Sequence, residues 1–331
     1  MDLITILLIV PGIFLLLKGA NLFVDSASSL ALRFKIKPIV IGLTVVAFGT
    51  SFPELSVNLL SAFDGNTDIA LGNIVGSNIA NILLILGMSA LFTKLTVEKN
   101  TTWKEIPLSF LGALFLFLFV FQNFLDARDF NQILNLSSNN FFGSITFTHG
   151  VVLLLVFIIF LYYTFELSKG KSDDTTEIKS MKLSKSIGLT TLGLVMIIFG
   201  GKFTVDSAVT MATIFGVSQG LIALTIVAVG TSLPELVTSV VASRKGQGDI
   251  AVGNVVGSNI FNIFFILGTT ATIKSIPVNF NNLLDIIFLL IVTILTFVSI
   301  FVFEKNKLGR KEGVAMLGLY FIYTVYLIYR G

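Results

Sequence analysis

GTSFPE, residues 49–54, lies in an apolar run that begins at Ile39, and it places a proline and a carboxylate where a buried helix ordinarily has neither. Pro53 has no backbone N–H, and its ring crowds the carbonyl of Gly49, so we expect the helix to break or kink here. Carbonyls released by such a break are costly in apolar surroundings unless they face protein, water or a ligand. A cation is one ligand that would satisfy them.

The same pattern returns as GTSLPE at residues 230–235, in equally apolar surroundings. An offset of 181 residues superimposes residues 41–87 on residues 222–268 without a gap, and more than half of the positions agree. A second matched block reads DIALGNIVGSNIANI in the first copy and DIAVGNVVGSNIFNI in the second. Such internal repetition predicts two structurally related halves.

Both copies carry oxygen-bearing side chains around the expected break. Those within one turn of it are Thr50, Ser51 and Glu54 in the first copy, and Thr231, Ser232 and Glu235 in the second. The second block adds polar side chains at i, i+4 and i+8, on one helix face: Asn73, Ser77 and Asn81, then Asn254, Ser258 and Asn262. Such hard oxygen donors suit Ca²⁺ and Na⁺. A soft metal is not indicated, because cysteine is absent and His149 is the single histidine.

The composition is that of a membrane protein. Of the 331 residues, 54% are hydrophobic and only 12% are charged, which is too little polar surface for a water-facing fold. Ten stretches are long enough to cross a hydrocarbon core of about 30 Å as helices. These predicted spans are residues 3–21, 38–63, 69–93, 106–125, 148–166, 186–204, 219–243, 250–273, 283–303 and 312–329.

Five spans separate equivalent points of the two copies, so the second copy enters the membrane in the opposite sense. We therefore predict an all-α membrane protein of ten transmembrane helices in two inverted-topology five-helix repeats, with broken helices at the central site. Secondary transporters use this arrangement. The first repeat is placed at residues 1–166 and the second at residues 186–331, joined by a linker at residues 167–185.

Two polar stretches interrupt the apolar pattern. The linker is mixed in charge and too short for a regulatory domain, so we expect it to be flexible and cytoplasmic. The other, residues 122–148, is rich in Asn and Ser and faces outside in this topology. We expect it to include a short surface helix near Asp126–Leu134.

The basic residues predict the orientation. Seventeen of the 22 lie in the connections after odd-numbered spans, near residues 33–37, 94–104, 169–185, 244–245 and 305–311. Because short cytoplasmic loops collect Lys and Arg, both termini are predicted outside the cell (inner or plasma) membrane. The net charge of +3 then requires no nucleic-acid partner, and no obligate protein partner is evident.

At these motifs the sequence resembles the sodium/calcium exchanger family of the calcium/cation antiporter superfamily, in its prokaryotic ten-span type. The two repeats of that family carry the same GTS-x-PE and G-N-x-x-G-S-N-I pairing. The resemblance covers all ten predicted spans. It implies an antiporter that exchanges Ca²⁺ for Na⁺ by alternating access and has no cofactor besides the transported ions.

By matching position, the resemblance implies that Glu54 and Glu235 bind both Ca²⁺ and Na⁺. It implies an inward-facing Na⁺ shell and an outward-facing one. The inner shell comprises Ala47, Thr50, Ser51 and Ser77, and the outer shell Ala228, Thr231, Ser232 and Ser258. Asn81 and Asn262 flank the central position.

Residue 262 departs from much of the family, because it is Asn where many members have Asp. Potassium-dependent relatives rely on an acid there, so Asn at both 81 and 262 favours K⁺-independent exchange. Three Na⁺ per Ca²⁺, which the resemblance implies, would make the cycle electrogenic. The proton/calcium branch usually reads GN-x-x-E in place of GTS-x-PE, which favours Na⁺ as counter-ion and leaves H⁺/Ca²⁺ exchange as the alternative.

Two other classes of function are less well supported. A channel could use the same oxygen-lined centre, but inverted broken helices with acids at mid-membrane fit alternating access better. An intramembrane enzyme would need HExxH or paired catalytic aspartates, which are absent, and Ser77 and Ser258 have no histidine base. The sequence therefore predicts a transporter and not an enzyme.

Overall fold

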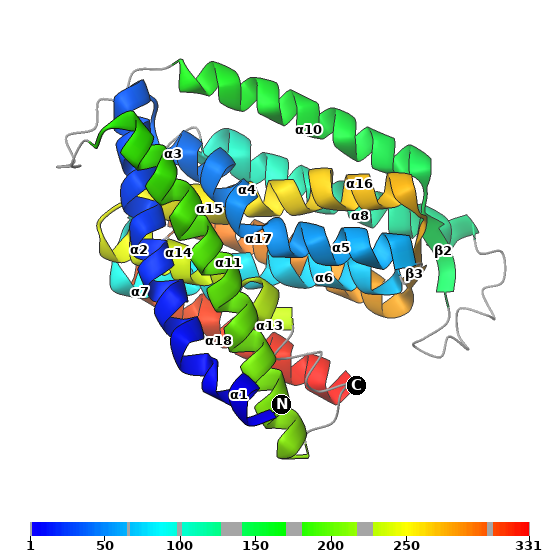
Figure 1. The fold of residues 1–331 in the computed structure, drawn as a ribbon. Coiled ribbons are helices and arrows are strands. Elements are labelled where there is room, and N and C mark those ends of the chain that lie inside the picture. Colours follow the sequence, from blue (N-terminus) through cyan, green and yellow to red (C-terminus); the bar gives the residue numbers. More distant parts are fainter. Residues whose placement is uncertain are drawn as a thin grey trace.

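The computed structural model describes residues 2–64, 67–97, 101–126, 141–169, 181–216, 228–302 and 307–330. These residues are almost entirely helical (Figure 1). The long continuous helices, preceded by the short α1 (Asp2–Leu7), are α2 (Ile9–Phe34), α8 (Ile106–Asp126), α10 (Phe147–Ser168), α11 (Leu183–Ile214), α17 (Phe280–Val302) and α18 (Arg310–Arg330).

Interrupted helices form the rest of the bundle. One path runs through α3 (Pro38–Ile41), the π-helical turn η1 (Gly42–Val46), α4 (Ala47–Thr50) and α5 (Phe52–Asp64). Its counterpart in the second half comprises α13 (Ala228–Thr231) and α14 (Leu233–Arg244). Two further paths are α6 (Asp68–Ala80), η2 (Asn81–Ile85) and α7 (Leu86–Phe92), and α15 (Gly248–Ile260), η5 (Phe261–Leu267) and α16 (Gly268–Ile273). The π-helical η2 and η5 interrupt their helices at matching places, as π-bulges often do at functional sites.

Eight helices in the described part of the chain are long and apolar enough to cross a membrane. The number is nine if the bent pair Pro38–Thr50 and Phe52–Asp64 is counted as one span. The prediction of an all-helical membrane protein is therefore confirmed. The predicted span 219–243 is described only from Ala228 onward, where it contains α13 and α14. The count of ten spans and their inverted topology stay predictions.

Two predicted spans were too short. The spans at residues 3–21 and 186–204 correspond to helices that continue to Phe34 and Ile214. These helices, α2 and α11, lie side by side and cross the other helices obliquely (Figure 1). Their contact is close enough that a Cβ on Gly200 would lie 2.6 Å from the backbone nitrogen of Leu16. They form a pair distinct from the helices that carry the motifs.

The motif helices of the two halves pack against one another. α15 lies along α3, η1 and α4, where a Cβ on Gly253 would be 2.7 Å from the carbonyl oxygen of Ile39. α6 likewise contacts α13 and η5 of the second half. The core is thus shared by the two halves.

Two small antiparallel sheets were not predicted. β1 (Leu95–Thr96) pairs with β4 (Lys307–Leu308), and β2 (Phe141–Ile145) pairs with β3 (Ile276–Asn279). β2 occupies the end of the polar stretch 122–148. The surface helix predicted near Asp126–Leu134 lies outside the described residues, except that α8 ends at Asp126.

Candidate functional site

The helix breaks where the proline was expected to break it. α4 ends at Thr50 and α5 begins at Phe52, and the helical segments Pro38–Thr50 and Phe52–Asp64 meet at an angle of 46°. In the second half α13 ends at Thr231 and α14 begins at Leu233. Glu54 and Glu235 each lie in the first turn after the break, where the positive end of the helix dipole stabilises a carboxylate.

Hydrogen bonds join the two breaks across the halves of the chain. Ser51 Oγ donates to Glu235 Oε1 over 2.8 Å and lies 3.0 Å from Ser258 Oγ. Ser232 Oγ donates to Glu54 Oε1 over 3.4 Å. Each half therefore supplies the carboxylate that a serine of the other half contacts. Both carboxylates are buried.

Thr50 is held by the second half in a similar way. Its hydroxyl donates to Asn254 Oδ1 over 3.1 Å, and Asn254 Nδ2 donates to Ser239 Oγ over 2.9 Å. Asn254 therefore connects the first break to α14. The sequence had placed Asn254 on the polar face of its helix, and the structure confirms that it faces the break.

Six buried oxygen atoms of the predicted site residues have no hydrogen-bond partner within the described residues. They are Glu54 Oε2, Glu235 Oε2, Asn81 Oδ1, Asn262 Oδ1, Ser77 Oγ and Thr231 Oγ1. Buried polar atoms are nearly always hydrogen-bonded, so this set calls for another explanation. Two carboxylate, two amide and two hydroxyl oxygens are the ligand types that a hard cation takes.

The remaining predicted residues fall beside this set. Ala47, Ser51, Ser232 and Ser258 are buried at the breaks or on α15. Ala228 begins α13, but its side chain lies outside what the structure describes.

Sequence reasoning missed Asn78 and Asn259, which follow Ser77 and Ser258 directly. Asn81 Nδ2 donates to Asn259 Oδ1, and Asn262 Nδ2 donates to Asn78 Oδ1, each over 3.0 Å. Both residues are buried. Their identity in the two copies was a signal, but the helix-face pattern at i, i+4 and i+8 passed over them.

Most of the chain matches a known protein family. The model of the sodium/calcium exchanger protein family matches residues 4–166 and 185–329. This chain belongs to the sodium/calcium exchanger family. The resemblance to this family, inferred from the two sequence motifs, is thereby confirmed.

Relatives along nearly the whole chain agree with this membership. The chain is 31% identical to the sodium/calcium exchanger MaX1 of Methanosarcina acetivorans, covering 98% of this chain and 99% of the relative. It is 36% identical to the putative antiporter CaxA of Alkalimonas amylolytica over 80% of each. The solved structure of the sodium-calcium exchanger NCX_Mj soaked with 10 mM Na⁺ superimposes with a TM-score of 0.80 at 30% identity, covering 97% of this chain and 98% of that chain.

Family membership settles the class of function. The protein is an integral membrane cation/Ca²⁺ antiporter, of a family that transports Ca²⁺ and Na⁺, and it is not an enzyme. The channel and the intramembrane enzyme are therefore set aside.

Proposed function

We propose that this protein exchanges Ca²⁺ for Na⁺ by alternating access, and that Glu54 and Glu235 are ligands of both ions. The observation that supports this most strongly is the set of buried, unpartnered oxygens contributed by both halves of the chain. A carboxylate removed from water requires a compensating charge, and a cation supplies it. No ion pair involving either glutamate occurs among the described residues.

We assign the Na⁺ ligands around the two breaks. One shell comprises Ala47, Thr50, Ser51 and Ser77, and the other Ala228, Thr231, Ser232 and Ser258. The hydroxyl contacts across the breaks support this assignment, because Ser51 and Ser232 each reach the opposite carboxylate. The amide oxygens of Asn81 and Asn262 complete the central position.

The charge of the site supports electrogenic exchange. With Asn at positions 81 and 262, the central acids are Glu54 and Glu235, which carry a charge of −2 when both are ionised. One Ca²⁺ neutralises this charge, whereas three Na⁺ leave an excess of +1. Each cycle then moves a net charge, and its free energy changes by about 2.3 kcal/mol per charge per 100 mV. No third acid is present at 262 to hold K⁺, so K⁺ is not required.

We also propose how the molecule is arranged in the membrane. Two inverted repeats, residues 1–166 and 186–331, place both termini outside the cell membrane, with the linker 167–185 in the cytoplasm. The pair formed by α2 and α11 slides against the motif helices to switch access. α2 and α11 contact each other far more extensively than either contacts the motif helices, which supports that role.

A gradient experiment tests the coupling ion. Proteoliposomes containing the protein are given either a Na⁺ gradient or a pH gradient alone, and Ca²⁺ uptake is followed with and without K⁺. The proposal predicts uptake with the Na⁺ gradient, a dependence on voltage and no requirement for K⁺. Uptake driven by the pH gradient in Na⁺-free medium, with no response to Na⁺, would establish the proton-coupled alternative.

A further inference from the structure

Four asparagines, two of them in the candidate ion site, link the two halves of the chain. Asn81 and Asn262 each use their amide NH₂ to bond an asparagine of the opposite half, over 3.0 Å in both cases. Their Oδ1 atoms are buried and have no hydrogen-bond partner among the described residues. The nitrogen side of each amide is thus held, and the oxygen side is left for another ligand.

We propose that Asn78 and Asn259 are positioning residues, which orient Asn262 and Asn81 so that these present oxygen, and not NH₂, to the transported cation. The inference rests on the proposed function, because it assigns a purpose to the free Oδ1 atoms of Asn81 and Asn262. Asn78 and Asn259 are not themselves ligands in this arrangement. Their own Oδ1 atoms already accept the hydrogen bonds from Asn262 and Asn81.

An asparagine ligand requires such control because its two ends have nearly the same shape and opposite hydrogen-bonding character. Rotation of the amide by half a turn would direct its NH₂ group at the cation. The partial positive charge of NH₂ would then repel the cation. The Oδ1 atoms of Asn78 and Asn259 accept the hydrogen bonds of these NH₂ groups. A rotated amide would bring two oxygens together and leave a buried donor unsatisfied, which disfavours the rotated form.

The orientation of Asn78 is itself fixed by the second half. Asn78 Nδ2 donates to the backbone oxygen of Asn259 over 3.3 Å, so its Oδ1 is turned toward Asn262. A backbone carbonyl can only accept, which removes the ambiguity between the two ends of this amide. The chain of contacts therefore runs from the backbone of α15, through Asn78, to the amide of Asn262.

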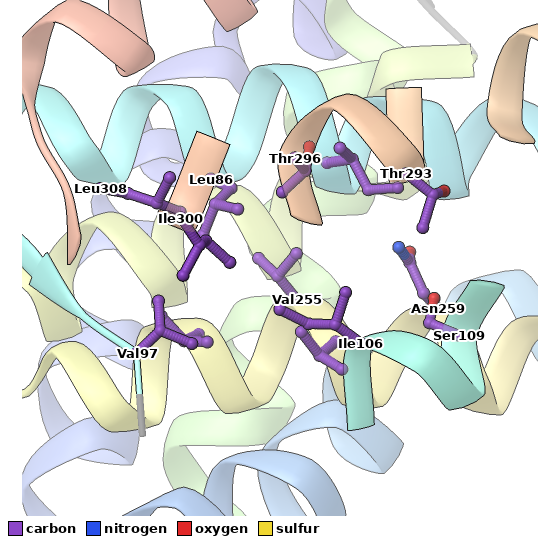
Figure 2. A pocket seen from close by; sticks show the side chains of 13 residues that line it. Leu86, Val97, Ile106, Ser109, Val255, Asn259, Thr293, Thr296, Ile300 and Leu308 are labelled. Atoms are coloured by element: carbon purple, nitrogen blue, oxygen red, sulfur yellow. The ribbon is translucent and has the colours of Figure 1, made fainter. Parts of the chain in front are cut away.

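Asn259 has a different environment. It lines a cavity between α8, η2, α15 and α17, and Figure 2 shows its amide extending into this cavity toward Thr293. The lining is largely apolar, and the hydroxyl of Thr293 donates to the carbonyl of Leu289 in its own helix. Among the described residues, the hydrogen bond from Asn81 Nδ2 is the one that holds the side chain of Asn259. Asn78 is therefore the more tightly held of the two.

The decisive experiment combines Asn78→Ala with Asn262→Asp in proteoliposomes and measures the Ca²⁺ concentration that gives half-maximal exchange. Asn78→Ala alone should raise this concentration about tenfold, as expected for the loss of one buried hydrogen bond, and change the maximal rate much less. In the Asn262→Asp background it should have no further effect, because a carboxylate presents oxygen in either rotamer. A purely structural role for Asn78 would lower stability equally in both backgrounds.

A mirror pair and a control complete the test. Asn259→Ala should weaken Ca²⁺ binding in the same way, and Asn81→Asp should remove that effect, which keeps the inference testable if Asn78→Ala does not fold. Ser109→Ala, in the wall of the same cavity, should leave exchange unchanged. Normal Ca²⁺ affinity in both alanine variants, or strictly additive effects with the aspartates, would overturn the positioning role. Normal affinity in Asn262→Ala and Asn81→Ala would instead refute the proposed ion site.

Discussion

Ser51 Oγ, at the break of the first half, donates a hydrogen bond to Glu235 Oε1 of the second half over 2.8 Å. Residues 184 positions apart are thereby joined inside the membrane bundle. The contact leaves Glu235 Oε2 unpartnered within the described residues, as Glu54 Oε2 also is. Each carboxylate thus has one buried oxygen without a hydrogen bond, which the proposed function assigns to the transported cation.

Replacement of either carboxylate should abolish Ca²⁺ exchange. Glu54→Gln or Glu235→Gln removes one of two charges from a buried site that must replace the hydration shell of a divalent ion. The measurement is Na⁺-driven Ca²⁺ uptake by purified variants whose folding is checked by gel filtration and thermal unfolding. Near-normal uptake by either folded variant would contradict the assignment.

Ser51→Ala should weaken Ca²⁺ binding without abolishing transport. A hydrogen bond to a charged group contributes about 1.5–3 kcal/mol, so we expect the half-saturating Ca²⁺ concentration to rise roughly tenfold or more. Ser56→Ala is the matched control, because Ser56 Oγ bonds the carbonyl of Phe52 in its own helix. Equal Ca²⁺ affinity in the two variants would show that the contact with Glu235 has no role in binding.

Joining α2 to α14 should stop the cycle. Lys245 Nζ and Asp25 Oδ1 form an ion pair of 2.6 Å between α2 and the turn after α14, so these positions are close in this state. The chain has no cysteine, so Asp25→Cys with Lys245→Cys gives a clean background for a short bis-maleimide cross-linker. Exchange should cease on cross-linking, while the single-cysteine variants with the same reagent keep it. Undiminished transport in a fully cross-linked sample would exclude α2 as a moving element.

The close contact of α2 and α11 should be sensitive to small increases in size. A Cβ on Gly193 would lie 2.8 Å from the backbone nitrogen of Phe23, so Gly193→Val should lower the free energy of unfolding by about 1–3 kcal/mol. Gly188 lies on the same helix, where a Cβ would meet no described atom of a neighbouring element within 4 Å, and Gly188→Val serves as the matched control. Thermal unfolding in detergent compares them, and equal melting temperatures would rule out tight packing at Gly193.

Features with a local cause could be predicted from the sequence. The break at GTS follows from Pro53, whose missing N–H acts within one helical turn whatever the surroundings. The position of Glu54 and Glu235 after the breaks follows from the same cause. The hydrophobic spans were recognised because their length is set by the bilayer.

Features that depend on tertiary contacts were missed. The span predicted at residues 3–21 ended too early, because Ser26, Ser28 and Ser29 in the rest of α2 read as polar. In the structure Ser26 and Ser28 donate to carbonyls of their own helix, and Ser29 meets Ser186 of α11 over 3.0 Å. Their polarity is satisfied inside the bundle, which hydropathy does not register.

The roles of Asn78 and Asn259 could not be predicted from helix periodicity. Each lies one position beyond a predicted site serine, off the face that carries Ser77 and Asn81. Their contacts cross from one half of the chain to the other, so they depend on how α6 and α15 are placed together. The repeat itself gave the one available signal, because both copies carry Asn at this position.

Competition between the two ions for one site tests the central claim most directly. Ca²⁺ binding to the purified protein is measured by isothermal titration calorimetry at increasing Na⁺, with choline replacing Na⁺ at constant ionic strength, for the wild type and for Glu54→Gln and Glu235→Gln. We predict that Na⁺ lowers the apparent Ca²⁺ affinity of the wild type progressively and that neither variant binds Ca²⁺ measurably. Ca²⁺ binding that is independent of Na⁺, or that survives in both variants, would contradict a shared site at Glu54 and Glu235.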